Sequence, residues 1–301
     1  MKDTFAYYQV DELMAKNKRK VEVVVLSDIH LGTIGCRAEE LLKYLNSIQP
    51  KKLILNGDIV DIWQFKKRYW PKSHMRIIKH ITSLLSKGVP VYYVTGNHDE
   101  MLRKFEGFTL GKLQIVNKLI LNLNGKKAWV FHGDVFDVTM QYAKWLTRLG
   151  SIGYDLLIMI NSLVNYFAKL MGREKVSLSR KIKNSVKSAV KYINSFEQTA
   201  AEIAIDKGYD YVVCGHIHHP EYKEISTKNG STHYLNSGDW IESLSALEYN
   251  NGEWSIYEYN QDQNAKTMEP DLESYKLDDN EKIFKEMLVD FTSISGKSLP
   301  G

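Results

Sequence analysis

Five apolar runs in this chain are each followed at once by small and polar residues, and this repeated arrangement constrains the fold most. The runs are residues 23–26, 53–55, 91–94, 129–131 and 211–214. Each has the length and composition of a buried strand. Residues 38–47 and 74–86, between the first three runs, have the pattern of helices. Strands that alternate with helices predict a layered α/β core.

The polar residues that follow these runs can bind metal ions. They are Asp28 and His30, Asp58, Asn97, His132, and His216 with His218. Ligands of open α/β sheets bind beyond the carboxyl ends of the strands, so we expect the five groups to meet there. One Asp-x-His pair is weak evidence, because short motifs match by chance. Helix capping or surface exposure would explain a single group but not five groups at five strand ends.

Seven oxygen and nitrogen ligands are too many for one ion and suit two ions that share a carboxylate. We expect Asp58 to be the bridge. The first ion is assigned Asp28, His30, Asp58 and His218, and the second Asp58, Asn97, His132 and His216. A set without sulfur favours Mn²⁺, with Fe or Zn²⁺ as alternatives. Two such ions are suited to in-line displacement at phosphorus, since they activate water and neutralise phosphoryl oxygens.

Glycines stand beside these ligands at positions 57, 96, 133 and 215. We expect the backbone to turn sharply or to approach the ligands closely there. Three Asn-Gly pairs, at 124–125, 229–230 and 251–252, predict tight hairpins. These hairpins add antiparallel strands, so the sequence predicts two packed sheets with helices outside.

Composition narrows the class of protein. The chain has 301 residues and a net charge of +4, which is too mild to indicate a nucleic-acid partner and suits an anionic small molecule or an acidic membrane surface. Two cysteines, Cys36 and Cys214, provide no disulfide framework, and residues 1–20 contain no apolar signal segment. We therefore expect a cytoplasmic protein.

A helical insertion is expected at about residues 137–208, within a domain of residues 1–260. Residues 154–171 are strongly apolar, and either a core helix or an interfacial helix fits them. Residues 179–193 place Arg180, Lys183 and Lys187 on one helix face, which is either a solvated face or an anion clamp. Residues 261–301 are polar and predict a peripheral tail.

The polar groups together resemble the signature of the calcineurin-like metallophosphoesterases. The matching blocks are Asp28-x-His30, Gly57-Asp58-x-x-Asp61, Gly96-Asn97-His98-Asp99, His132-Gly133-Asp134 and Gly215-His216-x-His218. The resemblance implies a four-layer αββα sandwich with a two-metal site. It also implies that Asn97 and His98 contact the scissile phosphate, that His98 protonates the leaving group, and that Asp99 holds its imidazole.

Within that family, the insertion is similar to the lid of the UDP-2,3-diacylglucosamine pyrophosphatases of lipid A synthesis. The resemblance implies that Arg180, Lys183 and Lys187 bind the diphosphate, and that the products are 2,3-diacylglucosamine 1-phosphate and UMP. The apolar stretch at 154–171 and the basic face beyond it predict peripheral contact with the inner face of the cell membrane. Those enzymes carry Arg where this chain has His98, so a metallophosphodiesterase acting on another nucleotide or lipid phosphoester stays an alternative. A metal-free scaffold on the same fold is the alternative outside catalysis.

Overall fold

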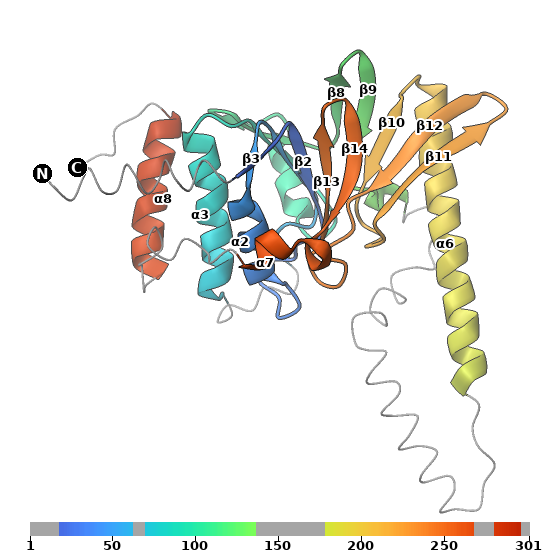
Figure 1. Ribbon diagram of the computed structural model, residues 1–301, viewed down its shortest axis with the longest axis horizontal. Coiled ribbons are helices and arrows are strands. Elements are labelled where there is room, and N and C mark those ends of the chain that lie inside the picture. The colour runs from blue at the N-terminus through green and yellow to red at the C-terminus, as the bar shows by residue number, and fades with distance from the viewer. Residues whose placement is uncertain (1–17, 63–69, 137–177, 268–279, 296–301) are drawn as a thin grey trace, which may run out of the picture. The chain divides into compact units, whose positions relative to one another are not determined.

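A computed structural model describes residues 18–62, 70–136, 178–267 and 280–295 of the chain (Figure 1). The described residues divide into two compact units, those within the ranges 1–133 and 204–301 and those within the range 134–203. The apolar stretch at 154–171 lies outside the described residues. Within the described part, no helix is both long enough and apolar enough to cross a bilayer.

A seven-stranded mixed sheet forms the centre of the first unit, in the order β14-β13-β2-β4-β5-β7-β6. Strands β2 (Val23–Leu26), β4 (Leu53–Asn56), β5 (Val91–Val94) and β7 (Leu113–Val116) are parallel. β13 (Ser245–Asn250), β14 (Glu253–Glu258) and β6 (Thr109–Leu110) add antiparallel pairs at the edges. The ends of the parallel strands that carry the predicted ligands therefore lie at one edge of the sheet.

A second mixed sheet has the order β11-β12-β10-β9-β8. β9 (Lys126–Val130), β10 (Tyr211–Cys214) and β12 (Gly230–Asn236) are parallel, and β8 (Leu119–Leu123) and β11 (Glu221–Thr227) are antiparallel to their neighbours. A small pair, β1 (Arg19–Val21) and β3 (Ile48–Pro50), completes the strands of the described residues.

Alternation along β2 shows why the two sheets pack together. Val23 and Val25 join the core between the sheets, whereas Val24 and Leu26 join the core under the helices. Successive side chains of a strand point to opposite faces, so a strand with four apolar residues is buried on both sides. The predicted α/β fold with two mixed sheets and flanking helices is confirmed.

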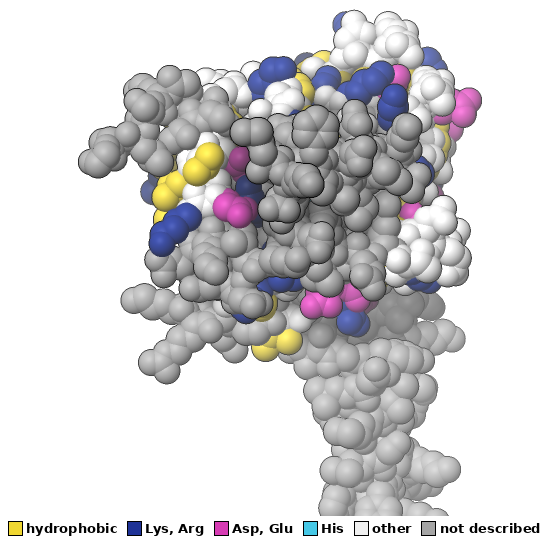
Figure 2. Space-filling model, turned by 60° about the vertical axis from the view of Figure 1, so that its left-hand side comes forward, with side chains coloured by type: hydrophobic (Ala, Val, Ile, Leu, Met, Phe, Trp, Pro, Cys, Tyr) yellow, Lys and Arg dark blue, Asp and Glu magenta, His cyan; other side chains and the backbone are white. Residues whose placement is uncertain are grey.

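The helices of the first unit cover the seven-stranded sheet. α2 (Ala38–Ser47) and α3 (Lys72–Ser86) contribute Leu41, Leu45 and Ile77 to the core. α3 packs against both α2 and α8 (Asn280–Ser295), and α7 (Gln263–Thr267) contacts α2 (Figure 1). Short 3-10 helices lie at Glu100–Phe105 (η1), Asp134–Phe136 (η2) and Tyr259–Gln261 (η3). On the face drawn in Figure 2, Lys and Arg side chains form several separate groups with Asp and Glu among them.

Two of the three predicted hairpin loops form as expected. Asn124 and Gly125 have φ values of 53° and 87°, and Asn251 and Gly252 have 53° and 90°, as a type I′ turn requires. The third loop is one residue earlier than predicted. Thr227 pairs with Gly230, so Gly230 opens the following strand with φ 144° instead of forming the turn.

The second unit contains most of α6 (Leu178–Asp206), and the last three residues of that helix belong to the first unit. Phe136 packs edge-on against Phe196 within it, with ring centroids 5.4 Å apart. The basic positions 180, 183 and 187 lie on this helix, but their side chains are outside the described part of the structure. Their predicted role in binding the substrate stays a prediction, as does the lid boundary at 137–208.

Candidate metal centre

The predicted ligands stand where strands of both sheets end, and their backbone is unusual. Asp28 and His30 follow β2, and Asp58 follows β4. Their φ values are 50°, 53° and 54°, and those of His216 and His218, after β10, are 69° and 54°. Non-glycine residues seldom adopt this left-handed conformation, and such positions cluster at functional sites. This conformation turns the chain abruptly at the strand end.

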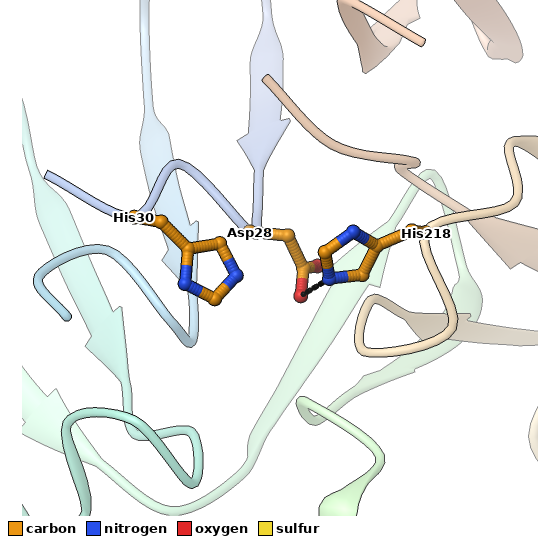
Figure 3. A group of neighbouring side chains, drawn as sticks. All are labelled: Asp28, His30 and His218. Carbon is orange, nitrogen blue, oxygen red and sulfur yellow. Dashed lines mark ion pairs between the residues drawn. The ribbon is translucent and has the colours of Figure 1, made fainter. Parts of the chain in front are cut away.

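Asp28, His30 and His218 form the first cluster, with ligand atoms within 4.8 Å of one another (Figure 3). The Nε2 atom of His218 lies 3.2 Å from Oδ1 of Asp28. Figure 3 shows the three side chains converging from two separate loops, with the dashed ion pair between Asp28 and His218. Nitrogen and oxygen atoms from two segments thus face one point.

Asp58, His132 and His216 form the second cluster, within the same limit of 4.8 Å. Oδ2 of Asp58 is 3.3 Å from Nε2 of His132 and 4.0 Å from Nε2 of His30. Asp58 therefore faces members of both clusters, as a bridging carboxylate must. Asp58 is 2% exposed, so its charge is almost entirely out of contact with water.

Two buried atoms support a metal ion in this centre. No hydrogen-bond partner among the described residues reaches Nε2 of His30 or Oδ1 of Asn97, although both atoms are buried. A buried polar atom without a partner costs about 1–3 kcal/mol, and a bound cation would remove that cost. The donor set contains imidazole nitrogen, carboxylate and amide oxygen and no sulfur, which suits a borderline or hard divalent ion. The residues present therefore fit the metal ions that the sequence predicted.

Protein oxygen atoms lie beside the Nδ1 atoms of His132, His30 and His218. His132 donates from Nδ1 to the carbonyl oxygen of Asn56 at 2.8 Å, and Nδ1 of His30 is 3.3 Å from Oδ2 of Asp61. A proton fixed on Nδ1 leaves Nε2 as the ligand atom. Nδ1 of His218 faces Oδ2 of Asp239 at 3.7 Å. Asp61 and Asp239 were not among the predicted site residues.

Close packing explains three of the glycines. A Cβ on Gly96 would overlap Asp58, at 2.6 Å from its backbone nitrogen, and one on Gly215 would stand 2.7 Å from Oδ2 of Asp28. A Cβ on Gly57 would overlap the ring of His132. Any side chain at these positions would displace a predicted ligand, as the sequence analysis expected of these glycines.

The charges of the centre stabilise one another. Burial opposes ionisation of Asp28, but the neighbouring His218 outweighs it and lowers the pKa of Asp28 to about 2. Burial likewise disfavours a charged His218, but Asp28 outweighs it and raises the pKa of that imidazole to about 9. Burial also opposes ionisation of Asp58, yet His132 holds its pKa well below the usual range. Without metal ions, the centre is therefore a network of paired charges.

His98 lies beside this network, and Asp61 orients it. Nδ1 of His98 is 2.9 Å from Oδ2 of Asp61, and Nε2 is 3.9 Å from Oδ2 of Asp58. Burial lowers the pKa of His98, but the contact with Asp61 and the charge of Asp58 outweigh it, so the net pKa is raised. The His98 backbone N–H also donates to Oδ1 of Asp58 at 2.9 Å.

Asp99 has a different place from the one expected. Its carboxylate accepts hydrogen bonds from the N–H groups of Gly96 and Ile59, at 2.6 and 3.0 Å, and from the hydroxyl of Tyr93 at 2.7 Å. The residue at the His98 imidazole is thus Asp61 and not Asp99, which instead ties the loop after β5 to the loop after β4. The Gly57-Asp58-x-x-Asp61 block carried the signal, because it places a second carboxylate three residues after the bridge.

The chain is similar to several known proteins. The family model of the calcineurin-like phosphoesterases matches residues 21–220. The UDP-2,3-diacylglucosamine hydrolase of Aliivibrio fischeri is 21% identical over 78% of this chain and 97% of its own length. The enzyme of the same name from Vibrio cholerae is 26% identical over 76% of this chain and 95% of its own. Among solved structures, a phosphoesterase from E. coli is 14% identical, with a TM-score of 0.40 over 79% of this chain and 93% of that one.

The matched segment begins two residues before β2 and ends two residues after His218, so it contains all seven predicted ligands together with Asp61 and His98. The family uses divalent metal ions, and the described His and Asp clusters provide the side chains to bind them. The chain belongs to the calcineurin-like phosphoesterases and is a metal-dependent phosphoesterase.

Proposed function

We propose that the protein hydrolyses UDP-2,3-diacylglucosamine to 2,3-diacylglucosamine 1-phosphate and UMP, with two divalent ions, Mn²⁺ by preference. The observation that carries the two-ion site is the placement of Asp58, which faces His132 of one cluster and His30 of the other. The substrate is suggested by the relatives of that name, which align over nearly their whole length at 21% and 26% identity.

The proposed ligands are those assigned from the sequence, with Asp58 shared between the ions. Asn97 is proposed to bind one ion, because its buried Oδ1 has no other partner among the described residues. When bound, the pair of ions activates the attacking water and neutralises the phosphoryl oxygens.

His98 is proposed as the proton donor to the leaving oxygen. Its Nε2 faces Asp58, which places the acidic proton beside the bridging carboxylate, and Asp61 holds the opposite nitrogen. The raised pKa keeps the ring protonated at a higher pH than an ordinary histidine. As water adds to phosphorus and the bond to the leaving oxygen breaks, the proton on Nε2 passes to that oxygen. General-acid catalysis of this kind contributes about 10²- to 10⁴-fold.

The test compares hydrolysis by the wild type with that by Asp58→Ala, His98→Ala and His219→Ala, each supplied with Mn²⁺. We expect no turnover for Asp58→Ala and a kcat about 10²- to 10⁴-fold lower for His98→Ala. His219 is exposed and adjacent to a proposed ligand, and its Nδ1 contacts only the neighbouring Pro220 carbonyl among the interactions described, so His219→Ala is the matched control. Near-normal turnover of Asp58→Ala would refute the two-ion mechanism.

A second candidate is hydrolysis of another nucleotide or lipid phosphodiester. It is favoured by His98, which stands where the best-defined lipid A enzymes carry Arg. Rates on UDP-2,3-diacylglucosamine and on bis-p-nitrophenyl phosphate separate the two candidates. A marked preference for the acylated nucleotide supports the first, and equal rates support the second.

Two further expectations accompany this proposal. Binding of the diphosphate by Arg180, Lys183 and Lys187 predicts a higher KM for their Ala variants, with kcat changed less. Contact with an anionic membrane surface predicts that the protein floats with anionic liposomes and not with neutral ones. Metal analysis after purification with manganese separates the enzyme from the scaffold alternative, which predicts a metal-free chain.

A further inference from the structure

We infer that Asp239 is a positioning residue for His218, which fixes the ring so that Nε2 is presented to the metal ion. Asp239 lies in the loop between β12 and β13, beyond the segment of residues 21–220 that matches the family. The inference rests on the proposed function, because it takes His218 to be a metal ligand.

The two oxygens of the Asp239 carboxylate have different surroundings. Oδ1 accepts the backbone N–H groups of Ile241, Glu242 and Ser243, at 2.7, 2.6 and 3.2 Å. Through these three hydrogen bonds, Oδ1 caps a turn. Oδ2 takes no part in that cap and faces Nδ1 of His218 at 3.7 Å. A residue that only capped the turn would not need its second oxygen directed at an imidazole in the centre.

The backbone around Asp239 holds this carboxylate in place. Its N–H donates to Oγ of Ser243 at 2.9 Å, and its carbonyl oxygen accepts the N–H of Ser245 at 3.1 Å. The next residue, Trp240, donates its N–H to the carbonyl oxygen of Asp28 at 3.1 Å. Asp239 is 1% exposed. The loop that carries Asp239 is therefore bonded to Asp28, the residue that pairs with the other side of the His218 ring.

His218 lies between two carboxylates, Asp28 at Nε2 and Asp239 at Nδ1. A metal ion on Nε2 requires the remaining ring proton to be on Nδ1, and Asp239 is the acceptor that faces it. His30 and His132 already show this arrangement, with Asp61 and the Asn56 carbonyl at their Nδ1 atoms. Asp239 has the corresponding place for a third histidine, with Oδ2 at 3.7 Å from Nδ1.

Asp239→Asn tests the role of Oδ2 alone, because it leaves an oxygen for the turn and replaces Oδ2 with an NH₂ group. The three N–H groups that donate to Oδ1 need an oxygen acceptor there, so they orient the new amide with its NH₂ group in the place of Oδ2. Two donors, the NH₂ group and Nδ1–H, would then face each other. The control is Asp262→Asn, because Asp262 also caps a turn, at the N–H of Ala265, and accepts from a side chain, Tyr257, far from the ligands in sequence.

The experiment titrates the metal-free full-length protein with Mn²⁺ in a calorimeter and measures the melting temperature of each metal-free variant. For Asp239→Asn we expect one of the two binding steps to be about 10- to 100-fold weaker, as for other residues that support a metal ligand. The metal-free melting temperature should change no more than it does in Asp262→Asn. Asp239→Ser, which keeps an oxygen for the turn but none for His218, should show the same loss, and it decides the question if Asp239→Asn does not fold.

A double-mutant cycle distinguishes positioning from a structural effect. In a His218→Ala background, Asp239→Asn should weaken Mn²⁺ binding no further, because the ring on which it acts is absent. Wild-type affinity for Mn²⁺ in both Asp239 variants, or an equal loss in the His218→Ala background, would overturn the inference. A wild type that binds fewer than two Mn²⁺ ions would instead refute the proposed function.

Discussion

Uptake of Mn²⁺ should become tighter as the pH rises, because His218 must lose a proton to act as a ligand. In the metal-free protein its pKa is raised to about 9, since the carboxylate of Asp28 outweighs the effect of burial. At neutral pH only about 1% of the molecules have Nε2 free for a metal ion, so the apparent affinity at that step is about 100-fold below its limit. Between about pH 6 and pH 8 the affinity should rise about tenfold per pH unit.

Calorimetry in two buffers with different heats of ionisation measures directly how many protons are released when Mn²⁺ binds. The wild type should release close to one proton from His218 at that step, in addition to any from other ligands. His218→Ala should lose this part of the pH dependence, whereas the control His219→Ala should keep it. An affinity that is constant between about pH 6 and pH 8, with no proton released, would refute the charge pairing described for Asp28 and His218.

Three other changes test the packing and the charges. Gly96→Ala places a Cβ against Asp58, so we expect loss of Mn²⁺ binding in calorimetry with secondary structure retained in circular dichroism; normal binding would contradict the close approach. Asp61→Asn should lower kcat by about tenfold or more and shift its pH profile, because His98 loses the carboxylate that orients it, and an unchanged profile would contradict this role. Burial lowers the pKa of His80 from 6.5 to about 3. As the pH falls below 6.5, the unfolded chain binds a proton at this residue and the folded chain does not, so the free energy of unfolding decreases. At about pH 5 this amounts to about 2 kcal/mol, so urea unfolding of His80→Leu should lose about that much less stability between neutral pH and pH 5 than the wild type.

Local sequence patterns were sufficient to predict the α/β fold. The strands at 23–26, 91–94 and 211–214 and the helix at 38–47 form within the predicted bounds, because apolar runs of strand length and a helical period are local signals. The seven predicted ligands follow these three strands and the two at 53–56 and 126–130, and parallel strands bring their carboxyl ends to one edge of a sheet.

Contacts between segments that are distant in the sequence could not be predicted from local sequence patterns. The family resemblance implied that Asp99 holds the His98 ring, but Asp61 reaches that ring from a different loop. Asp239 is 21 positions beyond its partner His218 in a turn with no motif of its own, so only the fold brings the two together. The left-handed backbone at five of the ligands was also unexpected, since these five are Asp or His and not glycine.

That left-handed backbone has a consequence for the evolution of the chain. Each non-glycine residue in this conformation destabilises the fold by about 1 kcal/mol, so the five ligand positions together lower the free energy of unfolding by about 5 kcal/mol. Native proteins have only about 5–15 kcal/mol of net stability, so mutations that replace these ligands can make the folded chain more stable while they abolish catalysis. Selection for hydrolysis and selection for thermal stability therefore act in opposite directions at the same five residues. Divalent ions that bound only the folded chain would offset this loss of stability.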